Sequence, residues 1–255
     1  MAGHLAAGTS VGLVRTHNED SAYVGRWLCA VADGMGGHVA GGVASTAVVD
    51  ALHPFDIGVS SPAELTSVLG HAVAAASARM AAMIAADPSL AGMGSTLVAM
   101  LWTDNHVGAA NIGDSRAYLV RHGALRQISE DHTMSKLVAN PAPAQISAFL
   151  VRYLDGRLDR SAGLTGRATL PGDRFLICSD GLSGVLEPGV IRDVPISVKD
   201  ADEAVTELIR LTHQAGAPDN VTVIVADTPE RAWRAAASTP LVLGAAASRA
   251  RMPTA

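Results

Sequence analysis

The chain has 255 residues, of which 49% are hydrophobic and 17% charged, so it can bury a sizeable core in one large or two small domains. A net charge of −5 without a basic block argues against nucleic acid as a partner. Cys29 and Cys178, the only two cysteines, lie in apolar runs, which disfavours a disulfide scaffold and fits a reducing, cytoplasmic setting. The N-terminus lacks a signal-peptide pattern and no uninterrupted apolar stretch is long enough to span a bilayer, so no membrane association is expected.

Apolar periodicity in the N-terminal half predicts a strand, a hairpin and two helices. They cover residues 5–15, 21–32, 39–52 and 61–86, in that order. The second helix has the clearest start, because Ser61 is a suitable N-cap, Pro62 suits the first helical position and Glu64 completes a capping box.

The second half of the chain predicts further strands, one amphipathic helix and a tail. The strands cover residues 97–102, 107–112, 117–120, 125–128, 174–178 and 221–225. The helix covers residues 198–215, with Asp200 as its N-cap. Residues 129–168 are the least regular part, with a helix start near Asp131 and a short helix over 144–150. Residues 231–255 are rich in alanine and are expected to form a frayed helix or a loose tail.

A set of carboxylates stands at the tips or breaks of these apolar segments: Glu19, Asp20, Asp33, Asp114, Asp180 and Asp219. If the strands belong to one sandwich, their tips converge, and so many carboxylates cannot all stay ionised without compensating positive charge. Ligands that are all oxygen suit magnesium or manganese and argue against zinc or copper. Two such ions can activate water for in-line attack on phosphorus, and Arg15 is suited to bind phosphate oxygens.

Six motifs occur in the order VRTHNED, VADGMGGH, GST, NIGDSRAY, CSDGL and PDNVTVIV. From Thr9 to about Asp227 this series resembles the metal-dependent protein phosphatases of type 2C, in their bacterial form. The resemblance implies an α+β fold, a four-layer αββα sandwich of two antiparallel sheets flanked by helices, with residues 1–230 as the catalytic domain. It further implies a signalling hydrolase that removes phosphate from phosphoserine and phosphothreonine, by direct attack of a hydroxide that bridges two Mn²⁺ or Mg²⁺ ions.

The resemblance also implies a role for each matching residue. Asp33 would bridge the two ions, Asp180 and Asp219 would hold the first ion, and Arg15 would bind the substrate phosphate. The other implied assignments are Glu19 and the Gly34 carbonyl at the second ion, Asp114 with Asp180 at a third, weaker site, and Asp20 and Asn220 as supports behind the ligands. No role is implied for the two cysteines, which are therefore expected in the core.

Two departures from the family pattern limit what can be carried over. Many eukaryotic members have a histidine, the proposed acid for the leaving group, near the position of Met35 here. Metal-bound water is then the default acid, and His38 is an alternative for which a structural role is favoured. The flap, the segment from Thr133 to Ser161, is short and interrupted by prolines, so the choice of substrate is not carried over.

The expected partners are phosphorylated proteins and a cognate bacterial Ser/Thr kinase, and the chain is expected to be a monomer. One alternative is a non-catalytic module of the same fold that binds metal and phosphoprotein, although the complete set of ligands argues against it. Another is a calcium-stabilised structural domain. Such a domain would be expected to carry a secretion signal and would not need Arg15.

Overall fold

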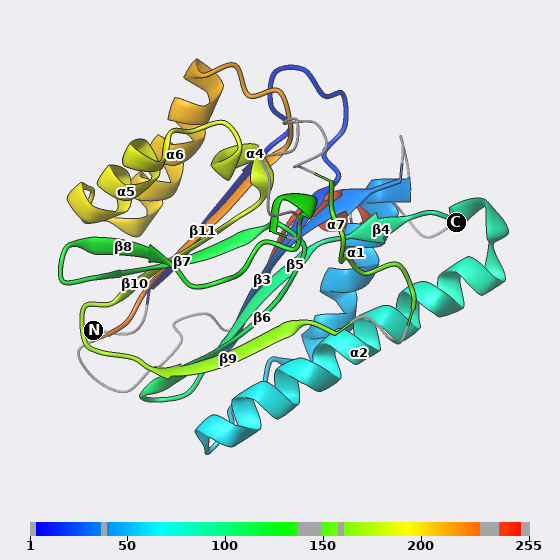
Figure 1. The fold of residues 1–255 in the computed structure, drawn as a ribbon, viewed down its shortest axis with the longest axis horizontal. Helices are drawn as coiled ribbons and strands as arrows, with labels where there is room; N and C mark the ends of the chain where they lie inside the picture. Colours follow the sequence, from blue (N-terminus) through cyan, green and yellow to red (C-terminus); the bar gives the residue numbers. More distant parts are fainter. Residues whose placement is uncertain (1–3, 37–39, 137–148, 158–160, 230–239, 251–255) are drawn as a thin grey trace.

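The computed structural model describes residues 4–36, 40–136, 149–157, 161–229 and 240–250. Two antiparallel sheets lie face to face, and helices cover the outer face of each (Figure 1). The predicted α+β class and four-layer sandwich are therefore confirmed.

The first sheet has five strands in the order β1-β11-β10-β7-β8. Their bounds are His4–Ser10 for β1, Val221–Asp227 for β11, Arg174–Cys178 for β10, Arg116–Arg121 for β7 and Ala124–Gln127 for β8. Its outer face carries α5 (Pro188–Ser197) and α6 (Ala201–Gln214). Helix α5 contacts β8, and α6 contacts β1 and β11. The predicted N-cap of α6 is confirmed, because the Asp200 side chain accepts a hydrogen bond from the Glu203 N–H.

The second sheet follows the order β12-β2-β3-β5-β6-β9, and β4 pairs with the end of β3. The strands are β12 (Leu241–Gly244), β2 (Asp20–Val24), β3 (Leu28–Met35), β4 (Gly94–Ser95), β5 (Leu97–Trp102), β6 (His106–Ile112) and β9 (Gly163–Ala168). Helices α1 (Ala40–Leu52) and α2 (Pro62–Ala86) cover its outer face, and α7 (Ala245–Ala250) packs on α1. Short 3-10 turns lie at His53–Phe55, Pro88–Leu90 and Met134–Lys136.

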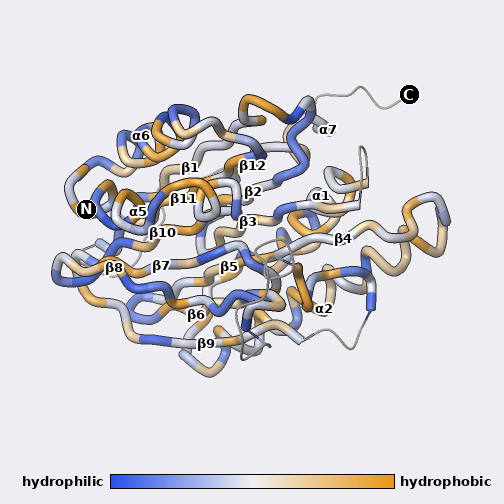
Figure 2. The backbone as a smooth tube through the Cα atoms, turned by 45° about the horizontal axis from the view of Figure 1, so that its top comes forward, coloured by the Kyte–Doolittle hydropathy of each residue, from blue (hydrophilic) through white to orange (hydrophobic). Residues whose placement is uncertain are grey.

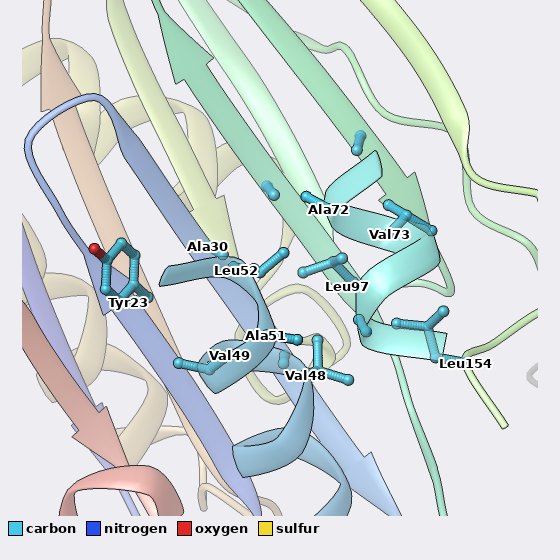
Figure 3. Close-up of a cluster of buried hydrophobic side chains, with 14 of the residues drawn as sticks. Tyr23, Ala30, Val48, Val49, Ala51, Leu52, Ala72, Val73, Leu97 and Leu154 are labelled. Atoms are coloured by element: carbon cyan, nitrogen blue, oxygen red, sulfur yellow. The ribbon is translucent and has the colours of Figure 1, made fainter. Parts of the chain in front are cut away.

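Three layers of buried side chains hold the four layers together. Between the sheets, Trp102 and Phe175 meet edge to face with ring centroids 6.0 Å apart. Figure 3 shows the cluster between the second sheet and its helices, where Val48 and Leu52 lie near Leu97. The third layer lies between α6 and the first sheet and includes Leu208 and Val223. Hydrophobic and hydrophilic residues alternate along α6 (Figure 2), which is the pattern of a helix with one buried face. Burial of these apolar surfaces is what fixes the positions of the strand ends.

Helix α2 is the one helix in the described part of the chain that is long and apolar enough, by length and composition, to cross a membrane. One of its faces, which includes Leu65, Leu69 and Met80, is buried against α1 and β6. Glu64 and Arg79 lie on the same helix and bind polar partners. This arrangement is that of a helix that covers a sheet.

Several sequence predictions need correction. The first strand ends at Ser10, five residues before the predicted end, so Arg15 lies in a loop, residues 11–19. Of the helix expected to start near Asp131, the structure describes the 3-10 turn at Met134–Lys136, and residues 137–148 lie outside its described part. The expected helix over 144–150 falls mainly on residues that the structure does not describe. Strand β9 and helix α5 were not predicted at all.

The described part of the tail is ordered, which contradicts a loose tail but agrees with a helix in this segment. Residues 241–244 form β12, which pairs with β2 from Val24 to Ser21, and Ala246 of α7 is buried. Gly244 has φ +74°, and a Cβ atom there would lie 2.1 Å from the Asp20 carbonyl oxygen. The end of the chain therefore packs directly behind one of the predicted site residues.

Candidate active site

A cleft of about 790 Å³ opens where strand ends of both sheets converge. Its walls include most of the residues that the sequence singles out: Arg15, Glu19, Asp33, Gly34, Asp114, Asp180, Asp219 and Asn220. Asp20 does not line the cleft and lies fully buried behind it. Phe149, Leu150 and Tyr153 of the predicted flap also line the cleft. Sequence reasoning assigned no site role to the remaining lining residues, which are Thr16, His17, Met35, Gly36 and Thr96.

Asp33 is held by its backbone near the end of β3. Its N–H donates to the Thr96 hydroxyl at 3.0 Å, and its carbonyl accepts from the Thr96 N–H at 2.8 Å. The Ser95 hydroxyl donates to the same carbonyl at 3.1 Å, and the Thr96 hydroxyl is also 2.7 Å from that of Ser115. The GST motif thus fixes the backbone of Asp33, a role that only the pairing of β3 with β4 and β5 reveals.

Two Asp-Gly pairs bring segments together at distances that a side chain would prevent. A Cβ atom on Gly34 would lie 1.9 Å from the Gly41 carbonyl oxygen, and the Gly34 N–H donates to the Glu19 carbonyl at 3.3 Å. A Cβ atom on Gly181 would lie 1.8 Å from the Asn220 carbonyl oxygen. Glycine is therefore required after Asp33 and Asp180 because the backbone of another segment passes there.

Asn220 connects three parts of the loop at residues 11–19. Its side-chain N–H groups donate to the carbonyls of Val11 and His17, both at 2.9 Å. Its side-chain oxygen accepts from the Glu19 N–H at 2.8 Å. This buried amide therefore fixes the loop that carries both Arg15 and Glu19.

Asp20 is paired with Asp33 across β2 and β3 and is held from the opposite sheet. The Ser179 hydroxyl donates to its carboxylate at 2.8 Å and accepts from the Thr222 N–H at 3.0 Å. Asp20 thus links the two sheets next to the cleft, between the strand end that carries Asp33 and the one that carries Asp180.

Four carboxylates in or behind the cleft have raised pKa values because they are buried close together: Asp20, Asp33, Asp114 and Asp180. Burial and the neighbouring Asp20 and Asp180 charges raise the pKa of Asp33 well above its ordinary value. Burial also raises the pKa of Asp20 and of Asp114 to about 7, and the Asp180 charge adds to both shifts. Asp33 and Asp180 share a hydrogen bond, and burial raises the pKa of Asp180 as well. A cation bound among them would relieve this repulsion.

Arg15 is the only arginine or lysine among the described residues that line the cleft. Its guanidinium donates to Asp219 at 2.7 Å, and this hydrogen bond and the charge of Asp219 raise the pKa of Arg15. The side chain is half exposed, so its remaining N–H groups are accessible to a ligand from the cleft. The arginine thus lies beside the carboxylates with donors available for an anion.

The donor set fits hard divalent cations, since the lining carboxylates and the Gly34 carbonyl offer only oxygen atoms. In the described residues, no three Asp, Glu, His or Cys side chains are already arranged around one point. Asp219 is turned to Arg15, so a cation that binds Asp219 would compete with this ion pair.

Cys29 and Cys178 are both free and fully buried, which confirms the prediction that they belong to the core. Burial raises the pKa of the Cys178 thiol to about 12 and also raises the pKa of Cys29. Neither lines the cleft. A thiolate nucleophile is therefore not available to the chemistry of this site.

The flap is described only at its two stems, residues 133–136 and 149–157, together with Ser161. Thr133 and Leu150 pair as an isolated β-bridge, and Leu154 pairs in the same way with Ser95, beside the Asp33 backbone. Phe149, Leu150 and Tyr153 line the cleft. Pro141, Pro143 and His38 lie outside the described residues, so the expectations that concern them stay predictions.

Comparisons with known proteins agree with this geometry. The family model described as Protein phosphatase 2C matches residues 7–226. The serine/threonine protein phosphatase PstP of Mycobacterium tuberculosis is 41% identical over 230 residues, which cover 87% of this chain and 44% of PstP. The protein phosphatase PhpP of Streptococcus pneumoniae is 31% identical over 237 residues, which cover 87% of this chain and 96% of PhpP. The chain thus spans less than half the length of PstP but nearly all of PhpP.

Solved structures show the same similarity. The M. tuberculosis phosphatase PstP/Ppp superposes with a TM-score of 0.83 at 40% identity, over 90% of this chain and 100% of that chain. The catalytic domain of PstP in complex with two manganese ions gives a TM-score of 0.82 at 41% identity, over 88% of this chain and 97% of that chain. The ordered motifs, the sandwich and the carboxylate cleft all agree with these matches, and this chain belongs to the protein phosphatase 2C family.

Proposed function

We propose that this protein is a phosphoprotein phosphatase that hydrolyses phosphoserine and phosphothreonine and depends on Mn²⁺ or Mg²⁺. The observation that carries the proposal is the cleft itself, in which five carboxylates with one arginine converge from both sheets. The names of the relatives support the reaction, and the PstP complex with two manganese ions supports the cofactor.

Two ions would be held by residues that already face the cleft. Asp33 would contact both ions, Asp180 and Asp219 the first, and Glu19 with the Gly34 carbonyl the second. Asp114, with Asp180, would form a third and weaker site. When bound, the ions supply an activated water for direct attack on phosphorus and neutralise charge on the phosphate oxygens.

The chain's own groups bind and orient the substrate. Arg15 would hold the phosphate oxygens with the donors that Asp219 does not use, and Asp219 would turn from Arg15 to a metal ion. Thr96 and Asn220 would keep the backbones of Asp33 and Glu19 in place during this exchange. Asp20 would support Asp33 from behind. No covalent phosphoenzyme is part of the proposal, since the nucleophile would be water activated by the bound ions. A cysteine nucleophile is not available either, because both cysteines are buried away from the cleft.

The substrates would be proteins phosphorylated by a cognate bacterial Ser/Thr kinase, in the cytoplasm. The proposed catalytic unit is a monomer whose domain comprises residues 1–230. The pairing of β12 with β2 adds residues 241–244 to this unit as an edge strand.

The test is release of inorganic phosphate from a phosphothreonine peptide by the purified protein. We expect activity with added Mn²⁺, background rates in excess chelator, and background rates for Asp33→Asn with Mn²⁺. A folded protein that binds the phosphopeptide but never releases phosphate with either ion would favour a non-catalytic binding module instead.

A further inference from the structure

His132 is a buried histidine that the proposed set of metal ligands does not include. It is 6% exposed and lies one residue before the flap. Its backbone N–H donates to the Gly113 carbonyl at 2.9 Å, and its ring Nδ1 accepts from the Gly113 N–H at 3.1 Å. One residue therefore binds both backbone groups of Gly113, which directly precedes Asp114.

The turn at Gly113 needs an external partner. Gly113 has φ +107°, and a Cβ atom there would lie 2.7 Å from the Thr96 side chain, so this position requires glycine. Glycine is conformationally permissive and does not by itself fix the direction in which the next residue points. The two hydrogen bonds from His132 supply that constraint, and Asp114 leaves the turn toward the cleft.

His132 is itself held from the second stem of the flap. Its carbonyl accepts from the Val151 N–H at 2.9 Å, beside the bridge between Thr133 and Leu150. Because a backbone N–H can only donate, Nδ1 must be unprotonated to accept from Gly113. Burial and the positive charge of Arg152 lower the pKa of His132, which favours the neutral ring that this bond requires.

We propose that His132 is a positioning residue for Asp114. Its neutral ring fixes the turn at Gly113 and so holds the Asp114 carboxylate toward Asp180, in the arrangement that the third, weaker metal site needs. This inference rests on the proposed function. It concerns the affinity of that one site for a divalent cation and the order of residues 113–115.

The first test is a Mn²⁺ titration of four proteins by calorimetry and by electron paramagnetic resonance: wild type, His132→Ala, His132→Asn and His106→Ala. Loss of a hydrogen bond behind a metal ligand typically weakens metal binding about 10- to 100-fold. We expect that loss at the weakest site of His132→Ala, with the two tighter sites unchanged. In His132→Asn the amide oxygen takes the place of Nδ1, so the affinity of the weakest site should return to within about threefold of wild type. His106 is the matched control, because its ring binds Asn105 at the opposite end of β6.

The second test needs neither metal nor turnover. In metal-free protein, amide hydrogen exchange at residues 113–115 should be faster in His132→Ala than in wild type and normal in His132→Asn. In wild type, a long-range proton–nitrogen NMR spectrum should show Nδ1 of His132 as the unprotonated ring nitrogen.

These outcomes separate this inference from the proposed function. An unchanged weakest site in His132→Ala, an equal loss at all sites, or a His132→Asn variant no better than alanine would overturn the positioning role, as would a protonated Nδ1. A wild-type protein that binds no Mn²⁺ at all would refute the proposed cofactor instead, while exchange at residues 113–115 would still decide whether His132 fixes the turn.

Discussion

At the scale of single residues, four acids in or behind the cleft bind protons more strongly in the folded state than in the unfolded state: Asp20, Asp33, Asp114 and Asp180. Their pKa values are raised because burial and mutual repulsion penalise the charged form, and Asp20 and Asp114 each reach about 7. Such groups make folding more favourable at low pH, since the native state keeps protons that the unfolded chain has released. A bound divalent cation would replace those protons.

The stability of metal-free protein should therefore fall as pH rises from about 4, the ordinary carboxyl pKa, to about 7, where Asp20 and Asp114 titrate. Urea unfolding at several pH values in chelator measures this directly. With saturating Mn²⁺ the fall should be much smaller, and Asp33→Asn should reduce it without metal. Metal-free stability that rises over this range would contradict the assigned pKa shifts.

Arg15 allows a prediction that separates binding of phosphate from binding of metal. A hydrogen bond to a charged group contributes about 1.5–3 kcal/mol, so Arg15→Ala should raise KM for a phosphopeptide by about 10- to 100-fold. Because Arg15 is hydrogen-bonded to Asp219, a proposed metal ligand, removal of Arg15 should leave the Mn²⁺ affinity unchanged or higher. Steady-state kinetics and a Mn²⁺ titration of the same samples check both parts.

Arg79→Ala is the matched control, since Arg79 forms an exposed pair with Asp50 away from the cleft. Arg15→Lys should recover only part of the loss, because lysine lacks the planar arrangement of donors. An Arg15→Ala enzyme with wild-type KM would show that another group binds the phosphate.

At the scale of elements, the first residues of the short helix α4 (Asp180–Ser183) lie in close contact with the backbone of the segment before β11. Gly181→Ala would place a Cβ atom 1.8 Å from the Asn220 carbonyl oxygen, so the backbones must separate. We expect a loss of about 3 kcal/mol or more in the free energy of unfolding, together with weaker Mn²⁺ binding. Gly189→Ala in α5 is the control, because nothing lies within 4 Å of a Cβ atom there. If the two variants unfold at the same urea concentration, the close contact is not a constraint.

The sequence predicts elements well where a local signal and a buried face agree. Helix α2 has its capping residues in place, since the Ser61 hydroxyl accepts from the Glu64 N–H, and α6 has Asp200. Strand β9 was missed because its residues are mostly exposed and carry no alternation, and α5 because it contains Pro195. Both depend on neighbours that are distant in sequence.

The same distinction applies to the site. Asp33 and Asp180 could be predicted because each stands at the end of an apolar run and precedes a glycine, Asp33 near the end of β3 and Asp180 just after β10. The groups that hold them could not, because the Thr96–Ser115 and Ser179–Asp20 pairs join segments that only the sheets bring together. The pairing of Arg15 with Asp219 spans 204 residues of sequence and gave no local signal.

At the scale of the whole molecule, the C-terminal strand connects the edge of the second sheet to the region behind the cleft. The Ala246 N–H donates to the Ser21 hydroxyl at 3.2 Å, and Gly244 packs on Asp20. Truncation after residue 229 should cost about 2 kcal/mol and lower Tm by about 4–8 °C. Leu241→Ala, at an exposed side chain, should change Tm far less. An unchanged Tm after truncation would mean that β12 adds nothing to the fold.

The central claim is that a carboxylate cleft in this chain uses divalent cations to hydrolyse phosphoserine and phosphothreonine. The most direct measurement follows Mn²⁺ occupancy and phosphate release from a phosphothreonine peptide in the same titration. Activity should rise as two ions bind and fall to background when chelator removes them, and Asp33→Asn should neither bind both ions nor release phosphate. Full activity in excess chelator, or in Asp33→Asn, would contradict the account.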